Sequence, residues 1–202
     1  NQNVQAVLEL LKPFAEVHVM SGHTHYAENN VYDSHYEHVH GAACGAWWNS
    51  TINVDGTPNG YAIYNIKGAT ITDWVYKGTG LDAQQQIRLY RANDIFMRDY
   101  SKNYQFYYKG DDQIVANVWN ADKDWKIEVY ENGIKTGEMT HFDYTGNEKD
   151  KSWDAWALGY HIGVVGKAEL DSNKKPTSYY QRNVRHLYYY TLQSSTASVE
   201  VR

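Results

Sequence analysis

The stretch Val17-His-Val-Met-Ser-Gly-His-Thr-His25 carries the sharpest pattern in this chain of 202 residues. Residues 16–20 alternate between polar and apolar side chains, which predicts a short β-strand. Ser21-Gly22 then predicts a turn, and two histidines separated by one residue follow it. In an extended segment the side chains of residues i and i+2 point to the same side. We therefore expect His23 and His25 to present two imidazoles at the strand end, where they can bind one metal ion or two neighbouring ions.

On either side of this stretch, the sequence predicts one helix and many short strands. Residues 4–11 repeat apolar side chains at helical spacing and stop before Pro13. Asn132-Gly133 predicts a tight hairpin. Segments rich in Val, Ile, Tyr and Trp, bounded by Gly, Asn and Asp, predict further strands at 38–43, 61–66, 71–77, 86–90, 104–108, 114–119, 125–130, 160–165, 186–192 and 197–201. The fold class that follows is mainly β, with an antiparallel β-sandwich. The segment 91–101 predicts a linker or short helix, and 145–152 and 171–178 predict surface loops.

The composition argues against several classes of protein. The net charge is −5, and Lys and Arg are not clustered, which gives no support to a nucleic-acid grip. No apolar run approaches the roughly 18 residues that indicate a membrane span. The single cysteine excludes an internal disulfide framework.

Several motifs together resemble one family of enzymes. A strand that leads into Ser21-Gly-His-Thr-His25 resembles the last metal-binding motif of the calcineurin-like metallophosphoesterases. Other segments are similar to the C-terminal half of a bacterial branch of that family, in which a β-rich domain follows the phosphoesterase domain: 38–48, 55–61, 74–80, 87–90, 117–121, 128–133 and 159–165. The resemblance implies the last helix and strands of a metallophosphoesterase αββα sandwich over residues 1–90, followed by a β-sandwich C-terminal domain over 91–202. The alternative boundary lies near residue 36.

The resemblance also implies a function. In this family a site with two divalent metal ions hydrolyses phosphate esters, and here His23 would bind one ion and His25 the other. Zinc, iron and manganese are not distinguished. The family's other ligand motifs, Asp-x-His, Gly-Asp-x-x-Asp and Gly-Asn-His-Glu/Asp, do not occur among the 22 residues before His23. We therefore expect a C-terminal fragment that is inactive by itself. Its partners would be a missing N-terminal catalytic portion and a phosphate-ester substrate, and the parent protein would be exported to the periplasm or cell surface.

Two alternatives stay open. One is a self-contained metal site built from the dense group His23, His25, Asp33, His35, His38 and His40. The other is a non-catalytic β-sandwich module that binds a carbohydrate or a protein through exposed aromatic side chains, drawn from the seven Trp and nineteen Tyr. If Trp47 and Trp48 were in a strand, their side chains would point to opposite sides, so at least one is expected to be exposed.

Overall fold

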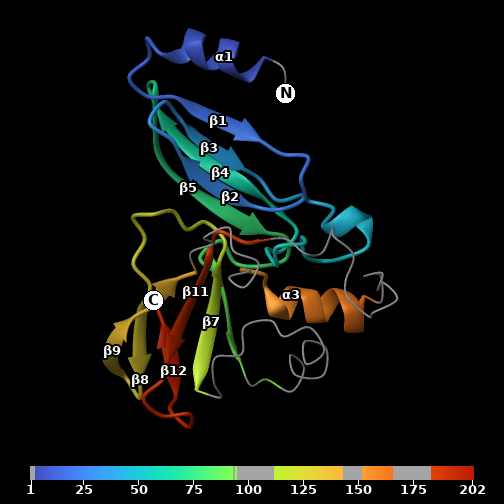
Figure 1. The fold of residues 1–202 in the computed structure, drawn as a ribbon, viewed down its shortest axis with the longest axis vertical. Helices are drawn as coiled ribbons and strands as arrows, with labels where there is room; N and C mark the ends of the chain where they lie inside the picture. Colours follow the sequence, from blue (N-terminus) through green and yellow to red (C-terminus); the bar gives the residue numbers. More distant parts are fainter. Residues whose placement is uncertain (1–2, 93, 95–111, 143–151, 166–182) are drawn as a thin grey trace.

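A computed structural model describes residues 3–92, 94, 112–142, 152–165 and 183–202 (Figure 1). The predicted strand at 104–108 and most of the predicted segments 91–101, 145–152 and 171–178 lie outside these residues. Within the described residues, no helix has the length and apolar character needed to cross a membrane.

The described chain is mainly β, as predicted. Helix α1 covers Val4–Leu11, the 3-10 turn η1 covers Ala46–Trp48, helix α3 covers Ala155–Gly159 and the π-helix η2 covers Tyr160–Val164. The strands are β1 His18–Ser21, β2 Glu28–Val31, β3 Tyr36–Val39, β4 Gly60–Lys67, β5 Thr70–Gly78, β6 Ile87–Arg91, β7 Gln113–Val118, β8 Glu128–Glu131, β9 Ile134–Glu138, β10 Thr140–His141, β11 Leu187–Thr191 and β12 Val199–Val201.

The C-terminal part is an antiparallel β-sandwich covered by a helix. One sheet has the order β10-β11-β7-β6 and the other β12-β8-β9. Strand β7 is buried along its whole length. Its residues Ile114, Ala116 and Val118 pack toward Val129 of the second sheet, whereas Val115 packs toward the hydrophobic cluster that includes residues of α3. The two-residue period of a strand thus places β7 between two layers, which confirms the predicted sandwich.

The N-terminal part has two smaller layers. Strand β1 pairs with β3 in parallel and β2 pairs with β3 antiparallel, in the order β1-β3-β2. The hairpin β4–β5 packs on one face of this sheet (Figure 1). The contact is aromatic: Tyr36 and His38 stack at 4.2 Å between ring centroids, and Trp74 meets the His38 ring edge-on at 5.0 Å.

Two local predictions have different outcomes. The hairpin turn at Asn132-Gly133 is confirmed, because both residues have the positive φ values of a tight turn, 52° and 81°, between β8 and β9. The strand predicted at 160–165 is wrong, since these residues form η2 directly after α3. The cause lies upstream: the Asp154 side chain accepts a hydrogen bond from the Ala157 backbone N–H at 2.8 Å and so caps a helix that continues through residues of β-type composition.

A buried loop joins the two parts of the molecule. Residues 52–58 are all buried, and the Asp55 carboxylate lies at their centre. One of its oxygens accepts hydrogen bonds from the Ala27 backbone N–H at 2.7 Å and from His186 Nε2 at 3.0 Å. The other accepts from the Thr57 backbone N–H and hydroxyl. Asn117 of β7 donates to the Asp55 carbonyl at 2.7 Å, so one residue ties together the β1–β2 connection, β7 and the entry to β11.

His38 forms the buried centre of the aromatic layer. It is completely shielded from solvent, and its Nε2 lies 2.8 Å from His18 Nδ1. Burial, with smaller contributions from the imidazoles of His18 and His40, lowers the pKa of His38 to about 4. Burial also lowers the pKa of His161, on η2, to about 4. Both imidazoles therefore stay neutral in the native state at pH values where an unfolded chain protonates its histidines.

We expect Asp55→Ala to lower the free energy of unfolding by about 3 kcal/mol or more, because it leaves several buried hydrogen-bond donors without an acceptor. Urea unfolding followed by tryptophan fluorescence measures this change. The matched control is Asp124→Ala: this carboxylate is exposed and pairs with Lys123 at the surface, so the free energy of unfolding should be nearly unchanged. Equal losses in the two variants would contradict the role given to Asp55.

We also expect the stability of the protein to fall between pH 6.5 and pH 4. In this window unfolding takes up protons at His38 and His161, since their native pKa values lie near 4 and the ordinary value is 6.5. Each of the two histidines contributes at most about 1.4 kcal/mol per pH unit to the slope of the free energy of unfolding against pH. His38→Phe keeps an aromatic ring but removes the titrating group, so urea unfolding at several pH values should give a shallower slope than in the wild type. An unchanged slope would contradict the assignment.

Candidate functional site

The two histidines of the candidate site lie on a strained turn and not on an extended segment. Strand β1 ends at Ser21, and His23 and His25 follow it with left-handed φ values of 78° and 59°. Gly22, which lies in the turn predicted at Ser21-Gly22, has no positive φ, and a Cβ added there would meet nothing within 4 Å. The bend therefore depends on the histidines themselves, and the prediction that both follow an extended path is wrong.

Backbone strain in the described residues concentrates at this place. Five non-glycine residues in the described part of the chain have positive φ, and one of them, Asn132, belongs to the β8–β9 hairpin turn. The other four are His23, His25, Trp47 and Trp48. Such conformations cost on the order of 1–3 kcal/mol each and persist where the surroundings enforce them, often at functional sites. The two strained segments also touch: the His25 ring stacks on Trp47 at 5.3 Å and meets the edge of Trp48 at 5.7 Å.

His25 is oriented as metal-binding histidines are. Its Nδ1 lies 2.7 Å from the carbonyl oxygen of Gly45. A carbonyl only accepts, so Nδ1 carries the proton, and the neutral ring has its lone pair on Nε2. In the described part of the chain, Nε2 makes no hydrogen bond. A backbone carbonyl that fixes the tautomer in this way is a frequent partner of metal-binding imidazoles. His23 is exposed, which leaves its ring accessible as well.

The carbonyl that orients His25 is itself held firmly. Gly45 has a left-handed φ of 64° and is buried. The next residue, Ala46, donates its backbone N–H to the carbonyl of Ile52 at 3.0 Å. The Asn59 side chain donates to the carbonyl of Ser50 at 3.0 Å. Both anchors belong to the buried loop or its end, so the position of the Gly45 carbonyl depends on that loop.

The self-contained metal site considered from the sequence is not formed. Among the described residues, no three His, Cys, Asp or Glu side chains come together in a group that could hold a metal ion. Because β1 and β3 are parallel, His35, which precedes β3, lies at the opposite end of the sheet from His23, which follows β1. Its ring stacks on Tyr32. His38 is bonded to His18 inside the aromatic layer, and His40 Nε2 lies 2.9 Å from the Tyr64 hydroxyl.

Sequence reasoning missed the residues that support His25. The proximity of Gly45, Trp47 and Trp48 to the histidine turn follows from the fold, although the sequence predicts that at least one of the two tryptophans is exposed. In fact both rings are exposed, by 51% for Trp47 and 72% for Trp48, and neither lies in a strand. A run of small residues, Gly41-Ala-Ala-Cys-Gly-Ala46, just before two tryptophans was the available signal.

One imidazole–carboxylate pair outside the candidate site has a structural role. Asp55 and His186 resemble a catalytic dyad in their spacing, but their side chains are only 1% and 4% exposed. Substrate therefore has no access to them in this structure. We assign them to stability, and we assign the candidate site to His23 and His25.

Comparison with known proteins agrees with the resemblance stated above. A family model described as the C terminal of calcineurin-like phosphoesterase matches residues 37–202. No curated protein and no solved structure gives a significant match to the chain. The match begins after the histidine turn, so the roles of His23 and His25 are argued from their geometry and from the motif around them.

We expect Gly45→Ala to disturb the candidate site far more than Gly68→Ala, although the two glycines have nearly the same φ. A Cβ at Gly45 would collide with the Ser50 carbonyl and lie 2.9 Å from that of Ile52, whereas Gly68, at φ 65°, has open space. Gly68→Ala should lose only about 1 kcal/mol of stability from left-handed strain. Gly45→Ala should lose clearly more. Thermal unfolding measures both losses, and the proton NMR signals of His25 should shift only in Gly45→Ala. Equal effects of the two substitutions would contradict the tight packing described for Gly45.

Proposed function

Because the chain belongs to the calcineurin-like phosphoesterase family and matches its C-terminal part, we propose that it supplies two ligands, His23 and His25, to a metal centre that hydrolyses phosphate esters. The intact enzyme would be a longer protein that contains this chain behind an N-terminal catalytic portion. The chain alone would be inactive. The single observation that carries the proposal is the orientation of His25: its Nδ1 donates to the Gly45 carbonyl, so the neutral ring has its lone pair on Nε2.

Two histidines suit part of such a centre and not the whole of it. Catalytic zinc sites in proteins usually have at least three protein ligands, and the described residues offer no third ligand near the pair. Neutral imidazole suits zinc, iron and related ions, so the donor set does not choose among them. When bound, two divalent ions would supply Lewis-acid polarisation of the phosphate. The remaining ligands would come from the N-terminal catalytic portion.

Exposed apolar surface at the start of the chain supports this partner. Helix α1 has an apolar stripe but no buried residue, and Leu10 is 76% exposed. Strand β1 pairs only with β3 in the described residues, although parallel strands are normally covered by further structure. Met20 on β1 is 48% exposed. We propose that the N-terminal catalytic portion covers α1 and continues the sheet beside β1.

The trailing β-sandwich would then support the site through the buried loop of residues 52–58. It holds the buried loop in place through Asn117 and His186, and the loop in turn holds the Gly45 carbonyl.

By resemblance to the bacterial branch, we also propose that the longer protein is exported, which fractionation of cells would test.

The proposal predicts that His25→Ala in the longer protein abolishes hydrolysis of p-nitrophenyl phosphate, with a loss of at least about 100-fold. It also predicts that metal content, measured by mass spectrometry on the purified protein, falls toward half. The isolated chain of 202 residues should hydrolyse nothing even with added zinc or manganese.

The matched control is His35→Ala, which removes an imidazole from the far end of the same sheet and should leave both metal content and hydrolysis unchanged. Unchanged metal content in His25→Ala would contradict the ligand role. Hydrolysis by the isolated chain that disappears in His25→Ala would contradict the expectation that the N-terminal portion is required.

A further inference from the structure

Two neighbouring tryptophans beside the candidate ligand are exposed to solvent. Trp47 is 51% exposed and Trp48 is 72% exposed, although a tryptophan side chain buries about 150–250 Å² when it packs in a core. Between residues 41 and 54 the chain carries no Asp, Glu, Lys or Arg. The segment that carries the two tryptophans is therefore aromatic and uncharged.

The two rings have a fixed position. Trp47 and Trp48 have left-handed φ values of 49° and 59°, and their ring centroids lie 6.1 Å apart at an angle of 45°. The segment is closed behind them, because the Asn49 backbone N–H donates to the Ala46 carbonyl at 3.0 Å. The Thr51 hydroxyl lies 2.9 Å from the Tyr160 hydroxyl of η2. Backbone strain is thus maintained at a place where it brings two apolar rings into solvent.

We propose that Trp47 and Trp48 form a ring-binding wall of the active site, and that the substrates are phosphate esters whose leaving group presents a flat ring. This inference rests on the proposed function. The Trp47 ring already touches the His25 ring at 5.3 Å, so a phosphate bound to a metal ion on Nε2 of His25 would have its leaving group within reach of the tryptophans. Trp48 keeps most of its surface free for stacking. The absence of carboxylates in this segment lets a phosphate dianion approach without repulsion.

A sugar ring and an aryl or base ring offer the same chemistry to this wall, since each has a flat face that stacks on indole. The competing occupant is polypeptide from the N-terminal portion, which would pack on the rings and hide them. The contact with His25 favours substrate, because a segment that covered both rings would also crowd the ligand. The test below separates these cases.

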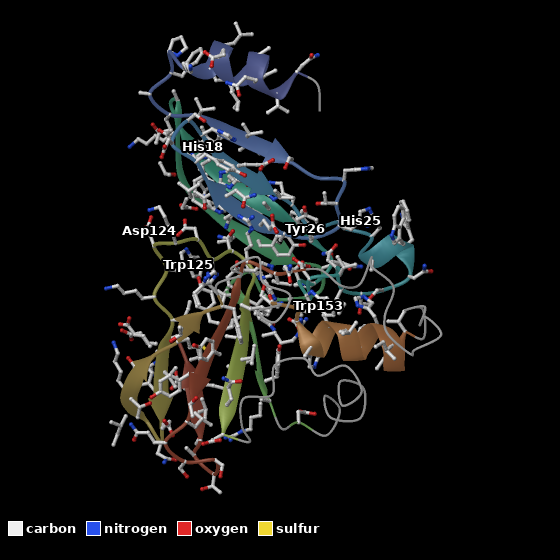
Figure 2. The ribbon with its side chains drawn as sticks, in the orientation of Figure 1. His18, His25, Tyr26, Asp124, Trp125 and Trp153 are labelled. Atoms are coloured by element: carbon white, nitrogen blue, oxygen red, sulfur yellow. The ribbon has the colours of Figure 1, made fainter. Side chains whose placement is uncertain are left out.

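The experiment compares binding of phenylphosphonate and methylphosphonate to the longer protein with its metals, by calorimetry. The wild type should bind phenylphosphonate about tenfold more tightly than methylphosphonate, and Trp48→Ala should remove this difference without changing metal content. Quenching of tryptophan fluorescence by phenylphosphonate should also disappear in Trp48→Ala. Trp125→Ala is the control: this residue is 39% exposed on the trailing part, away from His25 (Figure 2), and the preference should survive.

The outcomes separate the two proposals. If both phosphonates bind the wild type equally, the phosphate site stands and the ring-binding wall is refuted. If neither binds, the proposed function fails and the wall fails with it. If Trp48→Ala weakens both phosphonates equally and also lowers the unfolding temperature of the N-terminal portion, the rings pack on polypeptide and the inference is refuted.

Kinetics with hydrolysable substrates identify the kind of ring. Trp48→Ala should raise KM for a ring-bearing substrate about tenfold with kcat little changed, as expected for uniform binding, and leave glycerol 3-phosphate unaffected. An effect on p-nitrophenyl phosphate alone indicates aryl or base leaving groups, and an effect on glucose 6-phosphate indicates sugars. An equal rise of KM for all three substrates refutes the wall.

Discussion

The buried carboxylate of Asp55 is the constraint on which the rest of this structure depends. A buried carboxylate is tolerated only where hydrogen bonds replace its water, and Asp55 collects its donors from segments far apart in the chain. His186 is 131 residues away and Ala27 is 28 residues away. If one of these bonds is lost, a buried polar group is left without its partner. The loop of residues 52–58 therefore fixes the relative position of the N-terminal layers and the trailing sandwich. Neither of the predicted domain boundaries, at 36 or at 90, falls where such cross-bonds are absent, and the boundary itself stays a prediction.

The same loop also sets the geometry of the candidate site. Ile52 holds Ala46, and Ala46 follows the glycine whose carbonyl orients His25. The left-handed turn at His23 and His25 is short and mostly exposed, so it has little packing of its own to enforce a strained backbone. The order of the site is therefore provided from the side of the β-rich region. Under the proposed function, this gives a physical reason for the trailing region, because it would order two ligands of a metal centre whose other ligands lie in the N-terminal catalytic portion.

Some of this organisation could be predicted from the sequence. The alternation before Ser21 predicts β1, Asn132-Gly133 predicts its hairpin, and the apolar strands predict a sandwich, because each pattern is local and agrees with the final packing. The strand predicted at 160–165 is wrong because the composition of this segment favours a strand, whereas the cap at Asp154 starts a helix just before it. Residues 55–60, Asp-Gly-Thr-Pro-Asn-Gly, have the composition of an exposed turn. Their burial depends on partners more than 25 residues away, which no local pattern reveals.

The candidate site shows the same division between local chemistry and tertiary placement. The metal-binding role predicted for His23 and His25 comes from the resemblance of the motif around them to the last metal-binding motif of the family. It does not indicate which nitrogen is free. That property depends on the Gly45 carbonyl, 20 residues away in the chain, which accepts a hydrogen bond from Nδ1 of His25. Gly45 tolerates the crowding by the carbonyls of Ser50 and Ile52 because it has no Cβ. The sequence thus supplies the candidate ligand, whereas the fold selects the tautomer of its neutral ring, and a substitution at Gly45 can change which nitrogen of His25 is free.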